Sequence, residues 1–120
     1  MRPYERLAAW RHAHSLCLET YRLTATLPAS ERYGIVAQAR RAAFSVASNI
    51  AEGYAKRGSA ELRRYLDISL GSLSELSYCV ILARDLGYLT NAQWLAFEKL
   101  RDEAGRTLWG LYRSVAKRAA

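Results

Sequence analysis

The chain of 120 residues is 51% hydrophobic, which is enough for a single domain with a real core. Its 18 Lys and Arg against 11 Asp and Glu leave a net charge of +7, which fits nucleic-acid contact but also simple solubility. No stretch approaches the roughly 18 uninterrupted apolar residues of a membrane span, and no apolar signal core follows the N-terminus. We therefore expect a cytoplasmic protein without a membrane partner.

Strand signals are nearly absent, and the first of four predicted helices covers residues 5–26. A row of side chains at alternating steps of three and four predicts the face that this helix buries. The row comprises Leu7, Trp10, His14, Cys17, Tyr21 and Thr24. Pro28 predicts the end of the helix, because the residue before a proline disfavours helical backbone angles.

The second helix is predicted over residues 31–55, with Ser30 as its N-cap, and it has two different faces. The apolar face consists of Ala39, Ala42, Val46, Ile50 and Gly53. Beside it, at the same helical spacing, runs a polar row of Gln38, Arg41, Ser45, Asn49 and Glu52. Small residues between the rows predict the close approach of another helix.

The third and fourth helices are predicted over residues 60–86 and 91–117. Ser59 is a predicted N-cap and Gly87 a stop signal, and Thr90 with Gln93 has the spacing of a capping box that opens the fourth helix. The predicted core row of the third helix is Leu62, Leu66, Ser69, Leu73, Leu76, Val80 and Ala83. That of the fourth is Phe97, Leu100, Ala104, Leu108, Leu111 and Val115.

These lengths and connections predict one architecture. Each helix would span about 33–40 Å at 1.5 Å per residue, so the four are well matched in length. Connections of a few residues place consecutive helices antiparallel. We therefore expect an all-α protein whose single domain, residues 1–120, is an antiparallel up-down-up-down four-helix bundle.

The polar row on the second helix has two readings. In one, Glu52 is a general base and Arg41 is an anion clamp. In the other, which we favour, the row is a structural network, because fully paired buried polar groups specify how helices register. The predicted network comprises Gln38, Arg41, Ser45, Asn49, Glu52, Ser72 and Glu75, and Ser69 offers a further hydroxyl.

Patterns for catalysis or metal binding are weak. His12 and His14 are two residues apart, which separates them around one helix, and no Glu precedes either by three. Cys17 and Cys79 lie outside any CxxC spacing and are expected to be reduced core thiols. His14 and Cys17 are one turn apart, but no orienting carboxylate is evident. We expect no enzyme activity, metal, cofactor or small-molecule substrate.

Cationic side chains gather in the sequence around the connection between the second and third helices. The predicted nucleic-acid-binding residues are Arg40, Lys56, Arg57, Arg63 and Arg64. Tyr54 and Tyr65 are interleaved with them, and cations beside aromatic rings are typical of a nucleic-acid surface. The alternative is a solvated helix end whose charges suit the helix dipole.

The stretch from Gln38 to Gly53, with its Asn-Ile-Ala-Glu-Gly core at residues 49–53, resembles a bacterial family signature. The family comprises four-helix-bundle proteins first noticed in intervening sequences of 23S ribosomal RNA genes. Further matching positions, over roughly residues 4–90, include Leu7, Trp10, Tyr21, Pro28, Glu31, Tyr33, Gly34, Ser59, Glu61, Leu62, Arg64, Tyr65, Leu66, Gly71, Ser72, Glu75, Leu76, Leu86 and Gly87. Val46 replaces the usual isoleucine, and Ser69 replaces the usual alanine.

This resemblance implies a left-handed bundle that assembles as a ring-like homo-pentamer, with no established enzyme activity. A related branch, the accessory variability determinants of diversity-generating retroelements, implies binding to a reverse transcriptase and to nucleic acid. We therefore expect a non-enzymatic homo-oligomeric module with salt-dependent RNA, DNA or nucleoprotein contacts. The alternative is a purely structural protein–protein assembly partner, such as an accessory subunit of a reverse transcriptase, without direct nucleic-acid binding.

Overall fold

The computed structural model describes residues 1–119, and this part of the chain is helical with no β-strand. The long helices are α1 (Ala8–Thr24), α2 (Ile35–Tyr54), α3 (Ser59–Asp85) and α4 (Asn91–Ala119). Two short 3-10 helices, η1 (Pro3–Arg6) and η2 (Ala29–Glu31), precede α1 and α2. The prediction of an all-α protein with four helices is therefore confirmed.

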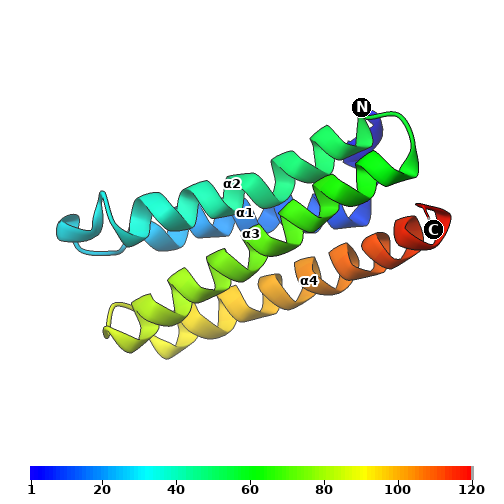
Figure 1. Ribbon diagram of the computed structural model, residues 1–120. Helices are drawn as coiled ribbons and strands as arrows, with labels where there is room; N and C mark the ends of the chain where they lie inside the picture. Colours follow the sequence, from blue (N-terminus) through cyan, green and yellow to red (C-terminus); the bar gives the residue numbers. More distant parts are fainter. Residues whose placement is uncertain (120) are drawn as a thin grey trace.

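Each long helix packs against two of the others (Figure 1). Helix α1 lies against α2 and α4, and α3 also lies against α2 and α4, with the most extensive interface between α2 and α3. The α1–α2 and α3–α4 pairs are therefore on opposite sides of an elongated molecule of 44 × 28 × 24 Å.

The predicted core rows of three helices are confirmed. The apolar row of α2 and the whole row of α3 are buried. In α4, Leu100 and Leu111 are partly buried against a row of fully buried residues. That row is Phe97, Ala104, Leu108 and Val115. The spacing of the apolar residues therefore predicted the buried faces of α2, α3 and α4.

The predicted buried face of the first helix is wrong. The residues that α1 buries are Ala9, Ala13, Leu16, Thr20, Leu23 and Thr24. Apart from Thr24, this is the predicted row moved back by one residue, a rotation of about 100°. His14 and Tyr21 are exposed, and Trp10 and Cys17 are only partly buried. The core selects small side chains here, and the Thr20 hydroxyl is satisfied by donating to the carbonyl oxygen of Leu16 at 2.8 Å.

The start of α2 also differs from the prediction. Ser30 lies in η2 and is not an N-cap, because α2 begins only at Ile35. The carboxylate of Glu31 accepts a hydrogen bond from the backbone N–H of Ile35 at 3.3 Å, so Glu31 satisfies one of the free donors at this helix start. The same carboxylate accepts a hydrogen bond from the Tyr88 hydroxyl at 3.1 Å, which raises the pKa of Tyr88. Glu31 therefore links the α1–α2 and α3–α4 connections.

Glycine and a capping box set the later boundaries. Gly58 and Gly87 have φ angles of 85° and 82°, a region that side chains disfavour, so both suit sharp helix ends. Ser59 is the first residue of α3 and makes no capping bond, contrary to the prediction. The Thr90–Gln93 capping box is confirmed, since Thr90 N donates to Gln93 Oε1 at 2.8 Å and Gln93 N to Thr90 Oγ1 at 3.1 Å.

Helix α3 contains more apolar surface than the bundle buries. It is the one helix of residues 1–119 whose length and composition would suffice for a membrane span, a test that buried core helices also pass. Its core row faces the other helices, whereas Ile68 and Tyr78 are exposed.

Candidate functional site

The α2–α3 turn brings together four of the five predicted nucleic-acid-binding residues. Lys56 and Arg57 lie between the end of α2 and the start of α3, and Arg63 and Arg64 follow in the first turns of α3. All four are exposed. The Lys56 ammonium lies 5.4 Å and the Arg64 guanidinium 4.8 Å from the centre of the Tyr65 ring. The turn is thus a cationic surface around one tyrosine.

The four cations differ in how they are neutralised. Arg64 pairs with Glu61 through contacts of 3.3 and 3.4 Å, and this hydrogen-bonded carboxylate raises the pKa of the Arg64 guanidinium. Among residues 1–119, no carboxylate forms an ion pair with Arg57 or Arg63. Of the four cations at this turn, Lys56, Arg57 and Arg63 therefore have no ion-pair partner among the described residues, and Arg64 has one.

Arg40 does not belong to this cluster. It lies seventeen residues before Arg57, about 25 Å along the helix axis, near the opposite end of α2. Its guanidinium donates to Thr24 Oγ1 at 2.9 Å and to the Tyr21 carbonyl oxygen at 3.3 Å, and lies 4.6 Å from the centre of the Tyr21 ring. Arg40 thus fastens α2 to α1, and adjacency to the turn was a wrong inference from the sequence.

The centre of the predicted polar network is present between α2 and α3. Ser45 Oγ and Ser72 Oγ are 2.7 Å apart, which joins the two helices. Asn49 Nδ2 donates to both the carbonyl oxygen and the hydroxyl of Ser45, each at 2.9 Å. Since all three side chains are half-buried, the shared hydrogen bonds fix the register of α2 on α3.

The ends of the predicted network are separate from its centre. Arg41 donates to Gln38 on the exposed surface of α2, with no link to Ser45. Glu52 and Glu75 are exposed, and neither has a hydrogen-bond or ion-pair partner within residues 1–119. Their carboxylates stay in solvent because the helix faces that carry them turn away from the α2–α3 interface. The polar row of the sequence is therefore a short network flanked by surface groups.

Ser69 is one of the two departures from the family pattern, and the structure explains how it is accommodated. The side chain is fully buried, and its hydroxyl donates to the Val46 carbonyl oxygen across the interface at 2.6 Å. Close contact nearby depends on Gly53, where an added Cβ would lie 2.7 Å from the Cβ of Tyr65. The α2–α3 interface therefore depends on the absence of a side chain at Gly53 and accommodates the hydroxyl of Ser69 through a hydrogen bond.

The two histidines contact neighbouring side chains, and the two cysteines are buried or partly buried. His12 Nδ1 lies 3.4 Å from Glu103 Oε2, and the His14 ring stacks on Trp10 with centroids 4.9 Å apart. Both cysteines are free thiols, and burial raises the pKa of Cys17 and of Cys79. No group of three or more His, Cys, Asp or Glu that could hold a metal occurs among the described residues.

The groove between α1 and α2 was not predicted from the sequence. Trp10, His14 and Cys17, which were predicted to lie in the core, instead line an open groove between α1 and α2. Phe44 of α2, which is 64% exposed, stands in the same groove. The signal was available in principle, because Phe44 lies off the apolar row of its helix.

The fold and these surfaces define a small all-helical protein built from four long packed helices. The chain belongs to the family of 23S rRNA-intervening sequence proteins, whose profile matches residues 5–110. The structure is similar to the crystal structure of a protein of unknown function from the S23 ribosomal protein family of Bacteroides thetaiotaomicron VPI-5482. The TM-score is 0.79 at 19% identity, over 87% of this chain and 97% of that one, a level of identity at which the likeness concerns the fold. No curated protein is significantly similar in sequence.

Proposed function

We propose that the protein is a non-enzymatic, homo-oligomeric helical-bundle module that contacts nucleic acid or nucleoprotein through the α2–α3 turn. The observation that carries the proposal is the cluster of exposed cations at this turn, where Arg57 and Arg63 have no ion-pair partner within residues 1–119 and Lys56 and Arg64 lie over the Tyr65 ring. Guanidinium groups bind phosphate oxygens well, and an aromatic ring offers a surface on which a base can stack. Binding would be largely independent of sequence, because phosphate contacts carry no base information.

Assembly would strengthen such contacts. In a ring each subunit presents its own turn, so that weak single contacts add through multivalency. The family resemblance implies a homo-pentamer of left-handed bundles. An up-down-up-down path is supported by the short connections and by the packing of each helix on the next one in sequence.

A second function, an assembly partner for another protein such as a reverse transcriptase, is favoured by a different observation. Apolar side chains stay exposed on two sides of the bundle, among them Phe44, Tyr78 and Trp109. Exposed apolar surface of this kind is typical of protein–protein contact sites. In this function the basic charge would serve solubility.

A titration of labelled RNA and DNA followed by fluorescence anisotropy, at about 50 and about 200 mM salt, separates the two functions. Binding is expected at the lower salt and should weaken steeply at the higher. The triple variant Arg57→Glu, Arg63→Glu and Arg64→Glu should lose binding with its helical content intact. The matched control reverses three exposed cations elsewhere, Arg22, Arg32 and Arg84, and should lose much less. Absence of binding by the parent at low salt would refute nucleic-acid contact and favour the second function.

A further inference from the structure

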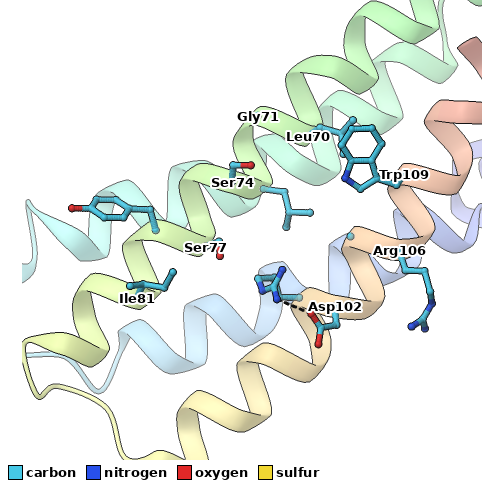
Figure 2. A pocket seen from close by; sticks show the side chains of 12 residues that line it. Leu70, Gly71, Ser74, Ser77, Ile81, Asp102, Arg106 and Trp109 are labelled. Atoms are coloured by element: carbon cyan, nitrogen blue, oxygen red, sulfur yellow. Dashed lines mark hydrogen bonds and ion pairs between the residues drawn. The ribbon is translucent and has the colours of Figure 1, made fainter.

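A groove between α3 and α4 lies outside the proposed site at the α2–α3 turn. Its volume is about 600 Å³, within the range of about 300–1,000 Å³ that is typical of small-ligand pockets. The lining combines small side chains, aromatic rings and guanidinium groups (Figure 2). Among the lining residues are Gly71, Ser74, Ser77, Gly105, Arg106 and Trp109.

The groove contains open space that the packing of the chain does not require. A Cβ built at Gly71 would meet no atom within 4 Å, and one at Gly105 would make only an ordinary contact of 3.6 Å with Leu73. Both glycines nevertheless weaken their helices relative to alanine. The hydroxyls of Ser74 and Ser77 make no side-chain hydrogen bond within residues 1–119. Glycine is typical where a ligand approaches the backbone, and free hydroxyls can bind its polar edge.

Trp109 presents an aromatic surface at the edge of this space. The residue is 47% exposed, and its ring reaches from α4 toward Leu70 of α3 (Figure 2). Tyr112 meets the Trp109 ring at an interplanar angle of 84°, with centroids 5.6 Å apart. This perpendicular neighbour restrains the indole, but no other aromatic ring stacks parallel to it among the described residues. An exposed indole of this kind is a surface on which a nucleobase can stack.

The free charge at the groove is positive. Arg101 is already paired with two carboxylates, those of Glu98 at 3.0 Å and Asp102 at 2.6 Å. Arg106, in the next turn of α4, is exposed and has no ion-pair partner within residues 1–119. An exposed guanidinium near an aromatic ring can bind the phosphate of a nucleotide whose base stacks on that ring.

Further cations connect the groove with the α2–α3 turn, which lies at the same end of the bundle as the end of α4 (Figure 1). Arg113 follows Arg106 by seven residues, a spacing that returns to the same side of the helix. On α3, Arg63 precedes Leu70 of the groove lining by seven residues. Asp67 lies between them on this row, so the cations outnumber the carboxylate along the path.

We propose that the α3–α4 groove binds an unpaired base of single-stranded RNA or DNA, stacked on Trp109 with its phosphate at Arg106. The backbone of the strand would follow the cations from the α2–α3 turn along α4. A base within a duplex has both faces covered by its neighbours, so only an unpaired base can enter the groove. This inference rests on the proposed nucleic-acid function and names its substrate class, a single strand.

The test compares a labelled oligo(U) strand with an oligo(A)–oligo(U) duplex of the same length, by fluorescence anisotropy at about 50 mM salt. Trp109→Leu removes the ring, Trp109→Phe keeps an aromatic face, and Gly71→Leu fills the open space without touching the ring. The matched control is Tyr33→Leu, which removes an exposed aromatic ring outside the groove that has the Arg32 guanidinium 5.5 Å from its centre. Circular dichroism and light scattering report helical content and mass for every variant.

The parent should bind the single strand more tightly than the duplex. Trp109→Leu should weaken binding of the strand about five-fold or more, the effect of losing one stacked base, and leave binding of the duplex unchanged. Gly71→Leu should have the same effect, whereas Trp109→Phe should recover most of the affinity and Tyr33→Leu should match the parent.

Three results would overturn the stacking site while the role of the turn stands. They are equal affinity of the parent for strand and duplex, an unchanged affinity of Trp109→Leu for the strand, and a loss of affinity that accompanies a fall in mass. Each would instead favour a protein contact at this face. A parent that binds neither nucleic acid would refute the proposed nucleic-acid function and this inference with it.

Discussion

Replacing Gly53 by alanine tests the packing of α2 against α3 most sharply. The new Cβ would lie 2.7 Å from the Cβ of Tyr65 and 3.1 Å from Cδ1 of Leu62. The Tyr65 Cβ is held by the α3 backbone, so relief requires the helices to separate. Overpacking of this kind costs about 1–3 kcal/mol, whereas alanine gains about 1 kcal/mol over glycine in a helix. We therefore expect Gly53→Ala to be neutral to about 2 kcal/mol less stable.

The matched control is Gly110→Ala, because a Cβ at Gly110 meets no atom within 4 Å. This variant should gain about 1 kcal/mol from helix propensity alone. Urea unfolding followed by circular dichroism gives both changes in free energy, and equal protein concentrations keep assembly from contributing differently. The reasoning is refuted if Gly53→Ala stabilises the protein as much as Gly110→Ala does.

Three further outcomes are expected. Asn49→Leu should lower the free energy of unfolding by about 1 kcal/mol, because it removes two bonds to Ser45 while Ser72 still satisfies the Ser45 hydroxyl; an unchanged urea midpoint would contradict this. Thr90→Ala should cost about 1 kcal/mol through loss of the α4 cap, and equal stability in the same assay would show that the cap is dispensable. Burial raises the pKa of both cysteines, so the folded chain holds their protons to higher pH than the unfolded chain does. The resulting stabilisation is fully present below the ordinary thiol pKa and is lost as pH rises through the raised pKa of the folded state. Alkylation just below the ordinary pKa should therefore be slower in the folded protein than in urea. Equal alkylation rates would contradict this.

Periodicity predicted the faces of α2, α3 and α4 because apolar residues at steps of three and four coincide there with the buried row, which in α2 includes the small residues Ala39, Ala42 and Gly53. In α1 the rule failed, since the core takes Ala9, Ala13 and Thr20 by size, and leaves Trp10 and Cys17 at the edge. Hydropathy ranks residues singly, so it cannot recognise that small side chains are preferred where helices approach closely.

The predicted sites divided along similar lines. Four of the predicted cations lie at one turn: Lys56, Arg57, Arg63 and Arg64. Their closeness in the sequence was enough to predict that they are close in space. Arg40 was misplaced because it lies seventeen residues before Arg57, most of them helical, and because its hydrogen bond to Thr24 involves a helix whose rotation the sequence did not predict. The sequence predicted that Ser45 and Ser72 belong to one polar network, and they are hydrogen-bonded. The exposure of Glu52 could not be predicted, because it depends on how α2 is rotated about its axis.

The salt dependence of RNA binding tests the proposed role of the α2–α3 turn most directly. The logarithm of the binding constant should fall linearly with the logarithm of salt concentration, because neutralised phosphates release counterions. Arg57→Gln with Arg63→Gln should make this slope shallower by about one for each phosphate that the variant no longer neutralises, whereas Arg22→Gln with Arg32→Gln should leave it unchanged. A slope that is the same for the parent and the Arg57–Arg63 variant would show that RNA is held elsewhere and contradict the assignment of the turn.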